Sequence, residues 1–488
     1  MKKEYLFILL AFGIVLNACK KDDFYTGSDA MLRFSSDTLT FDTVFTEVGS
    51  ATRFIKVYND LDQELKFDVR LNDESHFFRI NANGESGTDI RDITIRAHDS
   101  IYIFAEVTID PDQPVSISPF VINRTLEFTT NDNLQSVVLE AWGQNANYIP
   151  ADRKFNQNKI SICQGLSQVT WDDPKPYVIY GIAFVDICEL VIPAGAEIYV
   201  HGGYFKDDDG NYINLGIILV SQNGKLSING TLENPVVITG DRLEEAYENR
   251  QGQWSGIILL SNSKNNNIHH TTIKNSIVGI RVDSLAELNM DHSIVANTSG
   301  SGILAIHSKT NISNCLFYNN AINGLQLAFG GEHHYDYCTI VNDANDESAV
   351  SITNYLCYDP PFCEEVKANP SDVNFTNCII TGSNKDELSI IDVTDGQVGF
   401  MDFYFDHCVL RVDELLSENN YPNFFENSNA CQYYETMDNL FVGDEDYHLD
   451  TLSIAEKMAR PLLSKTDDLD GSLRDLITPD IGCYERID

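Results

Sequence analysis

Basic side chains in the middle of the chain are the first candidates for chemistry. A lyase that acts on uronates needs a base such as Lys, Arg or His, and a cation that neutralises the substrate carboxylate. Lys274 and Arg281 are the best-placed basic pair. Arg281 lies between two apolar residues on the outer side of a predicted strand, whereas Lys274 belongs to an earlier strand. We expect them to face different sheets as solvated surface charges.

Two histidine pairs, His269-His270 and His333-His334, could act as bases or metal ligands. The second histidine of the first pair precedes Ile273 by three residues, and that of the second pair precedes Ile340 by six. The two pairs therefore lie at different distances from these apolar residues, and we do not expect them to lie side by side. We expect hydrogen-bonded or exposed histidines.

A hydrolase would instead use paired Asp or Glu residues across one face. The segment 241–250 holds acids and an aromatic residue, and its spacing predicts a short helix with Glu244 and Glu248 on one side. We interpret this helix as a surface decoration, with a lid over a site as the alternative. Trp254, which follows, is expected to pack rather than to stack on a sugar. No basic or paired acidic residues stand out at equivalent outward positions of adjacent repeats.

Clustered oxygens at 206–211 and 467–471 could bind calcium. Neither segment fits the spacing of an EF-hand loop, and Asp-Gly turns explain both segments. The sequence therefore predicts no metal site and no cofactor, with calcium as the alternative.

The N-terminus has the order of an export signal, with a basic start, an apolar run over 5–15 and small residues before Cys19. The run is too short to span a bilayer. The segment resembles the bacterial lipobox, which implies loss of residues 1–18 and acylation of Cys19; an ordinary signal peptide that contains a cysteine is the alternative. Residues 20–23, inside a tether over 19–29, resemble the export signal of surface lipoproteins of the Bacteroidetes. That resemblance implies a lipid anchor in the outer membrane, exposed on the cell surface.

The charge of the chain restricts its partners. The net charge is -40, from 73 acidic and 33 basic residues among 488. Binding to phosphates needs a concentrated basic surface, so nucleic acid is excluded as a partner. Long-range attraction of polyanionic glycans is excluded as well, unless a cation intervenes.

Residues 30–145 show the alternation of strands that have one buried face. Apolar residues at 65, 67, 69 and 71 alternate with polar ones, and 101–109 and 137–141 repeat the pattern. Turn clusters separate these runs, which predicts an antiparallel β-sandwich. The order of a Leu-Thr-Phe start at 39–41, a Val-Gly turn at 48–49 and Lys-Val-Tyr-Asn at 56–59 resembles the immunoglobulin-like modules of the Hydin type. A spacer or partner-binding role is implied.

Residues 146–440 contain an internal repeat of about 22 residues. Apolar markers at Ile273, Ile294, Phe317 and Ile340 step by 21, 23 and 23 residues, and a Gly-apolar marker at 279, 302 and 324 steps by 23 and 22. Each unit holds short β-type runs with Gly and Asn and shows no helical period. We predict a solenoid of parallel strands with apolar residues stacked inward.

This repeat resembles the right-handed parallel β-helix superfamily, the pectate-lyase-like fold. Early rungs are represented by 191–196 and 224–231, and 441–488 resembles the closing segment of such proteins. The resemblance implies an all-β fold, with the sandwich followed by a right-handed parallel β-helix. It does not imply one activity, because the fold hosts lyases, hydrolases and proteins without activity.

Cysteines recur at one place in successive repeats, at Cys315, Cys338, Cys378 and Cys408. We predict a buried ladder of thiols, since free cysteine behaves as a small apolar residue. A zinc site lacks the paired close spacing that it needs. Cys357 and Cys363 bracket a loop that leaves the solenoid, and export would allow a disulfide between them.

The sequence favours a surface lipoprotein whose β-helix binds a glycan or protein ligand without catalysis. A secreted polysaccharide lyase or glycoside hydrolase is one alternative, and a structural cell-surface protein is the other.

Overall fold

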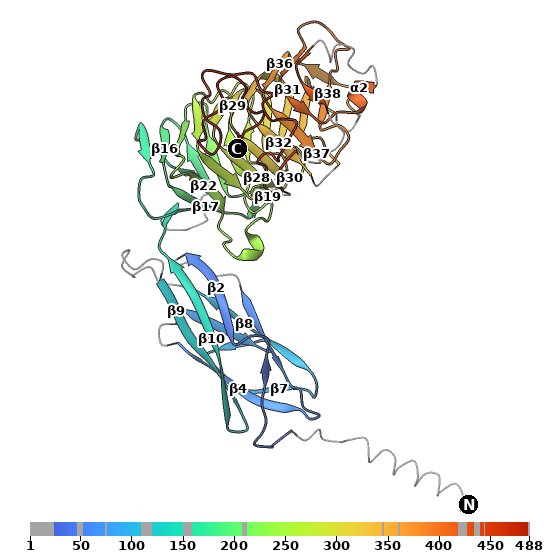
Figure 1. Cartoon of the computed structure of the whole chain (residues 1–488). Helices are drawn as coiled ribbons and strands as arrows, with labels where there is room; N and C mark the ends of the chain where they lie inside the picture. The colour runs from blue at the N-terminus through green and yellow to red at the C-terminus, as the bar shows by residue number, and fades with distance from the viewer. Residues whose placement is uncertain are drawn as a thin grey trace, which may run out of the picture. The chain divides into compact units, whose positions relative to one another are not determined.

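The computed structural model describes residues 24–45, 52–73, 76–108, 120–149, 159–206, 212–343, 346–359, 362–417, 427–433, 440–443 and 445–486. Cys19, the export signals before and after it, and residues 207–211 of the candidate calcium segment at 206–211 lie outside these residues. The chain divides into two compact units, 1–145 and 146–488 (Figure 1). No helix among the described residues has the length and hydropathy needed to cross a bilayer.

The first unit is a β-sandwich, as predicted. One sheet has the order β1 (Arg33–Phe34), β3 (Arg53–Tyr58), β8 (Ser100–Val107), β5 (Phe78–Ala82) and β6 (Glu85–Gly87). The other has the order β2 (Thr38–Phe45), β10 (Asn133–Gln144), β9 (Phe120–Thr130), β4 (Leu65–Asn72) and β7 (Asp89–Ile95). All neighbours are antiparallel except β2 and β10, which are parallel. Alternate residues of the strands face one core, which contains Phe41, Phe67 and Phe128.

The second unit is a parallel β-helix whose coils stack along two long sheets (Figure 1). The smaller sheet has eleven strands, in the order β11 (Asn147–Ile149), β14 (Tyr177–Tyr180), β17 (Glu197–His201), β22 (Val236–Gly240), β25 (Thr271–Lys274), β28 (Ile294–Thr298), β30 (Leu316–Asn320), β32 (Thr339–Asn342), β37 (Ile379–Gly382), β40 (Val409–Leu410) and β42 (Gln432–Tyr433).

The larger sheet has seventeen strands and bends where each coil turns a corner. In order they are β12 (Lys159–Ser161), β13 (Gln168–Thr170), β15 (Ile182–Val185), β16 (Glu189–Pro193), β20 (Ile217–Val220), β21 (Lys225–Asn229), β23 (Gly256–Leu259), β24 (Asn266–His269), β26 (Ile280–Val282), β27 (Glu287–Asp291), β29 (Ile303–Ser313), β31 (Leu325–Asp336), β33 (Val350–Thr353), β36 (Ser371–Thr376), β38 (Leu388–Ile391), β39 (Met401–Asp406) and β41 (Ser428–Asn429).

Among the described residues, two hairpins and two short helices decorate the coils. They are the hairpin of β18 (Tyr204–Lys206) and β19 (Tyr212–Asn214), the hairpin of β34 (Tyr355–Cys357) and β35 (Val366–Ala368), the 3-10 helix η2 (Glu245–Tyr247) and the helix α2 (Glu414–Ser417). A disulfide joins Cys357 to Cys363 across the second hairpin, and another joins Cys163 to Cys188 near the start of the solenoid.

The strand register explains the sequence repeat. Ile273 pairs with Val295, Val295 with Phe317, and Phe317 with Ile340, and all four side chains are buried. The repeat marker assigned to Ile294 is therefore wrong by one residue, because Val295 fills the inward position. Both residues are β-branched and apolar, and only the pairing of backbones tells them apart.

The cysteine ladder is present as predicted. Cys315, Cys338, Cys378 and Cys408 are buried free thiols, and half-buried Cys431 continues their row. The backbone N–H of Cys338 points to the Cys378 sulfur at 3.4 Å, and the N–H of Cys378 points to the Cys408 sulfur at 3.4 Å. Burial raises the pKa of the Cys378 thiol, which favours its protonated, apolar form.

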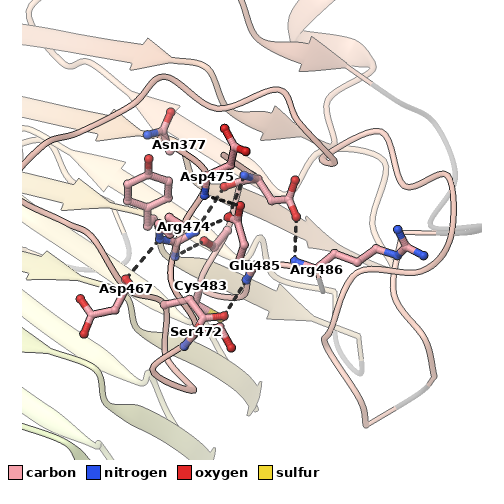
Figure 2. A network of polar contacts seen from close by, with 12 residues as sticks. Asn377, Asp467, Ser472, Arg474, Asp475, Cys483, Glu485 and Arg486 are labelled. Carbon is pink, nitrogen blue, oxygen red and sulfur yellow. Dashed lines mark hydrogen bonds and ion pairs between the residues drawn. The ribbon is translucent and has the colours of Figure 1, made fainter. Parts of the chain in front are cut away.

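The described residues of the closing segment, 441–443 and 445–486, pack against outward residues of the eleven-stranded sheet. Buried Arg474 anchors it (Figure 2). The guanidinium pairs with Glu485 at 3.4 Å, donates to Asn314 Oδ1 at 3.0 Å and lies 3.8 Å from the ring centre of Tyr337. The end of the chain is thereby fixed to two successive coils.

Candidate functional site

A groove of about 470 Å³ crosses five strands of the larger sheet, β27, β29, β31, β36 and β39. Its floor is a column of outward side chains in direct register, one from each strand. Its side follows the corner at which each coil bends, where His307, Pro370 and Gly399 lie. The groove therefore runs along the solenoid axis rather than along one strand.

The column on the floor consists of charged residues. In strand order these are Glu287, Lys309, Glu332, Asp372 and Asp402. Lys264 reaches Glu287 at 3.0 Å, and Lys309 reaches Glu332 at 2.7 Å. The hydrogen bond from Lys309 holds the pKa of Glu332 below its ordinary value. Asp372 and Asp402 follow as exposed acids, and Asn374 donates to Asp372 at 2.7 Å.

A second column of polar side chains lies beside the first and begins one strand earlier, in β24. Asn267, Asn289 and Asn311 form a ladder of amide hydrogen bonds, with Nδ2–Oδ1 distances of 3.1 and 3.0 Å. The same register continues through His334 and Asn374 to exposed Tyr404. Each ladder amide is thus oriented by its neighbours. Together the two columns present a continuous polar strip to solvent.

The charged column shows that the prediction of no paired acids at equivalent outward positions is wrong. Glu332, Asp372 and Asp402 occupy one position on three successive strands. Their sequence separations are 40 and 30 residues, outside the period of about 22, because insertions such as the β34–β35 hairpin intervene. A repeat pattern that allows insertions between strands would predict that these three acids share one position.

One family model matches part of the solenoid. Residues 163–282 match the family described as "Pectate-lyase like beta helix domain". These residues form a pectate-lyase-like β-helix domain. The match ends before β27, so most of the groove lies in later coils of the same solenoid. No curated protein matches the chain.

Solved structures resemble the chain only distantly. The catalytic unit of a GH87 alpha-1,3-glucanase from Streptomyces thermodiastaticus is 10% identical, with 73% of this chain and 79% of that chain covered and a TM-score of 0.26. A protein of unknown function from Porphyromonas gingivalis is 15% identical, and 28% of this chain spans 59% of its length, with a TM-score of 0.18. Likenesses at these TM-scores support no conclusion about function.

The basic pair Lys274 and Arg281 is not brought together within the pectate-lyase-like domain. Lys274 is in β25 of the smaller sheet and Arg281 in β26 of the larger one, as expected. Arg281 is exposed and pairs with Asp283 at 2.7 Å. Neither residue lines the groove.

The histidines hold local structure, as expected. His269 hydrogen-bonds to Asp291 at 2.7 Å, and this bond raises the pKa of His269. The ring of His270 stacks on that of His292, with centroids 4.7 Å apart. His333 is buried and bonds through Nδ1 to Thr310 at 2.9 Å, and its burial lowers its pKa to about 4.

The acidic insertion after the early coils does not form the predicted helix. It contains only the 3-10 turn η2, with Glu244 before it and Glu248 after it. Glu244 pairs with Arg242 at 3.0 Å, outside the groove. Trp254 is buried, and its Nε1 donates to the carbonyl oxygen of Lys274 at 2.9 Å, which agrees with a packing role.

The candidate calcium segment at 467–471 forms a turn. Asp468 accepts backbone N–H groups from Asp470, Ser472 and Glu485, so its oxygens are used within the closing segment. Across the described ranges, no group of three His, Cys, Asp or Glu residues has the geometry to hold a metal ion.

Proposed function

We propose that this protein is a lipid-anchored protein of the outer membrane that holds an extended glycan along the groove of its β-helix. The observation that carries this proposal is the in-register charged column on the groove floor, together with the in-register polar column beside it. A glycan chain repeats hydroxyl groups along its length, and the strands repeat amides and carboxylates about 4.8 Å apart. Each coil could therefore offer the same donors and acceptors to successive parts of a sugar chain.

Binding without catalysis is favoured by the charge state of Glu332 in the groove. A hydrolase needs one carboxyl that stays protonated near neutral pH to donate a proton to the leaving group. Lys309 acts in the opposite direction on Glu332, because it stabilises the charged form. The amide ladder can hydrogen-bond but cannot transfer protons at neutral pH.

Glycoside hydrolysis is the second candidate, and the three successive acids favour it. Carboxylates on adjacent strands lie roughly 5 Å apart and those on alternate strands roughly 10 Å, which brackets the separations used by retaining and inverting enzymes. Asp372 and Asp402 would then be the reacting pair, with Glu332 as a positioning residue.

The location is part of the proposal. Acylated Cys19 would anchor the chain, and the signal at 20–23 would place it on the cell surface. Surface exposure is tested by adding a protease or an antibody to intact cells. Lipid anchoring is tested by comparison with a Cys19→Ala variant. Release of the variant from membranes is expected.

The purified full-length chain should be incubated with neutral and acidic polysaccharides, with and without calcium, and scored for retention and for products. We expect retention without products, and for at least one polysaccharide we expect retention to be weakened at least tenfold in an Asp372→Asn, Asp402→Asn double variant. Asp172→Asn, an exposed acid away from the groove, is the matched control. If new chain ends form with the wild-type chain and not with the double variant, hydrolysis replaces binding as the proposed function. Silence in both assays would reject the groove as a glycan site.

A further inference from the structure

The outward face of one sheet of the sandwich carries aromatic side chains that the protein's own core does not use. The exposed fractions are 53% for Phe54, 43% for Tyr102 and 41% for Phe104. Phe54 pairs with Phe104 across β3 and β8, and Tyr102 pairs with Lys56 one step along. We call Phe54, Tyr58, Tyr102 and Phe104 the aromatic face.

Three rings of the aromatic face, those of Phe54, Tyr102 and Phe104, lie in contact with one another. The centroid of Phe54 lies 5.1 Å from that of Tyr102 in an edge contact and 6.2 Å from that of Phe104. The Lys56 ammonium lies 5.1 Å from the ring centre of Tyr58 and 5.4 Å from that of Tyr102. These contacts restrict the rotamers, so a ligand that stacks on the rings would lose less entropy on binding.

A cavity of about 660 Å³ adjoins the face and shares Phe104 with it. Its polar residues include Arg79, Asn81 and Glu106. Asn81 pairs with Phe104 and Arg79 with Glu106 across β5 and β8, so the polar groups continue the rows of the sheet. The volume lies within the roughly 300–1,000 Å³ of ligand sites, which combine apolar walls with a few polar groups.

We infer that the aromatic face and the adjoining cavity form a second binding site, for a neutral glycan. The C–H faces of sugar rings pack on aromatic rings, and sugar hydroxyls match amide, guanidinium and carboxylate groups. A neutral ligand is favoured because a chain of net charge -40 repels polyanions. A protein partner of ordinary size would cover about 800 Å² of this chain, far more than four side chains provide. This site lies in another unit from the groove and does not depend on the groove's function.

The test uses the purified full-length chain carrying the groove changes Asp372→Asn and Asp402→Asn, so that the groove is disabled. Retardation in gels containing laminarin, dextran or mannan is measured, with polygalacturonate as the acidic probe. We expect retardation by at least one neutral polysaccharide, weakened at least tenfold by Phe54→Ala with Tyr102→Ala. Trp142→Ala, which removes an exposed ring from the other sheet, is the matched control and should bind normally. Phe104→Tyr keeps the ring and should also bind normally.

Melting temperatures of all variants confirm that the sandwich remains folded. Absence of retardation by any neutral polysaccharide, retardation by polygalacturonate alone, or equal retardation with and without the two aromatic rings would each overturn the inference. A dimer in sedimentation that dissociates in the Phe54→Ala, Tyr102→Ala variant would overturn it in favour of a second copy of the chain. If neutral polysaccharides bind only when the groove is intact, this inference fails and the proposed function stands.

Discussion

Replacing Arg474 with methionine should destabilise the solenoid more than any change at an exposed arginine. The side chain of Arg474 is 2% exposed, and that of its partner Glu485 is 8% exposed. The substitution keeps most of the side-chain volume but removes the ion pair with Glu485 (Figure 2). It also removes the bonds to Asn314 Oδ1 and to the carbonyl oxygen of Gly482. The Glu485 carboxylate would then stay buried without its cation.

The expected loss in free energy of unfolding is about 3–5 kcal/mol, the range for removing one partner of a buried ion pair. Burial already raises the pKa of Glu485. Loss of Arg474 raises that pKa further, because the charged form loses its partner. A raised carboxyl pKa stabilises the folded state at low pH, and this contribution is lost as pH rises through the folded-state pKa. The loss should therefore be smaller near pH 5 than near pH 8.

Urea unfolding followed by tryptophan fluorescence measures this change, since Trp171 and Trp254 are buried in the solenoid. Arg281→Met is the control, because Arg281 is exposed and its pair with Asp283 should contribute under about 1 kcal/mol. Adding Glu485→Gln to the Arg474 variant should recover part of the loss. A loss below 1 kcal/mol, or a loss independent of pH, would refute the argument that Arg474 compensates a buried charge.

Three further outcomes follow from the packing of the coils. Because burial lowers the pKa of His333 to about 4, the free energy of unfolding should fall by up to about 3 kcal/mol as pH falls from 6.5 towards 4. Denaturation at several pH values should show this dependence, and His333→Asn should weaken it. A thiol reagent followed by mass spectrometry should modify half-buried Cys431 before buried Cys378, and equal rates would contradict the ladder. Gly331→Ala should cost about 2–4 kcal/mol in thermal unfolding, since Gly331 has a φ of +129° and a Cβ there would meet His333 Nε2 at 2.7 Å; Gly396→Ala, at a φ of +80° in open space, should cost less.

The coiled architecture could be predicted because stacking imposes a period on the residues that point inward. Ile280, Ile303 and Leu325 pair in direct register, and their spacing is visible in the sequence. The exact inward residue was harder to assign where two apolar residues are adjacent, as at Ile294 and Val295. Backbone pairing decides that choice, and it depends on neighbouring coils rather than on local sequence.

The groove acids could not be predicted, for a physical reason. Their register depends on where strands resume after insertions, and a parallel β-helix tolerates insertions at its corners without changing strand order. The disulfide of Cys163 and Cys188 was missed in the same way, since its cysteines belong to different coils and are 25 residues apart. The aromatic face could not be predicted from the sequence. Alternation predicts which residues point outward, but it does not predict that Phe54, Tyr102 and Phe104 lie side by side.

The anchoring of the closing segment bears on how the solenoid folds. Contacts between neighbouring coils join residues about 22 apart, as between Asn289 and Asn311. The closing segment adds contacts over 160 residues, from Arg474 to Asn314, and over 152 residues, from Lys465 to Ser313. A solenoid with neighbour contacts alone can fold coil by coil and fray from either end. Here the middle coils gain their last contacts only when the end of the chain has arrived, so a truncated or still-emerging chain has a less cooperative solenoid than the complete one.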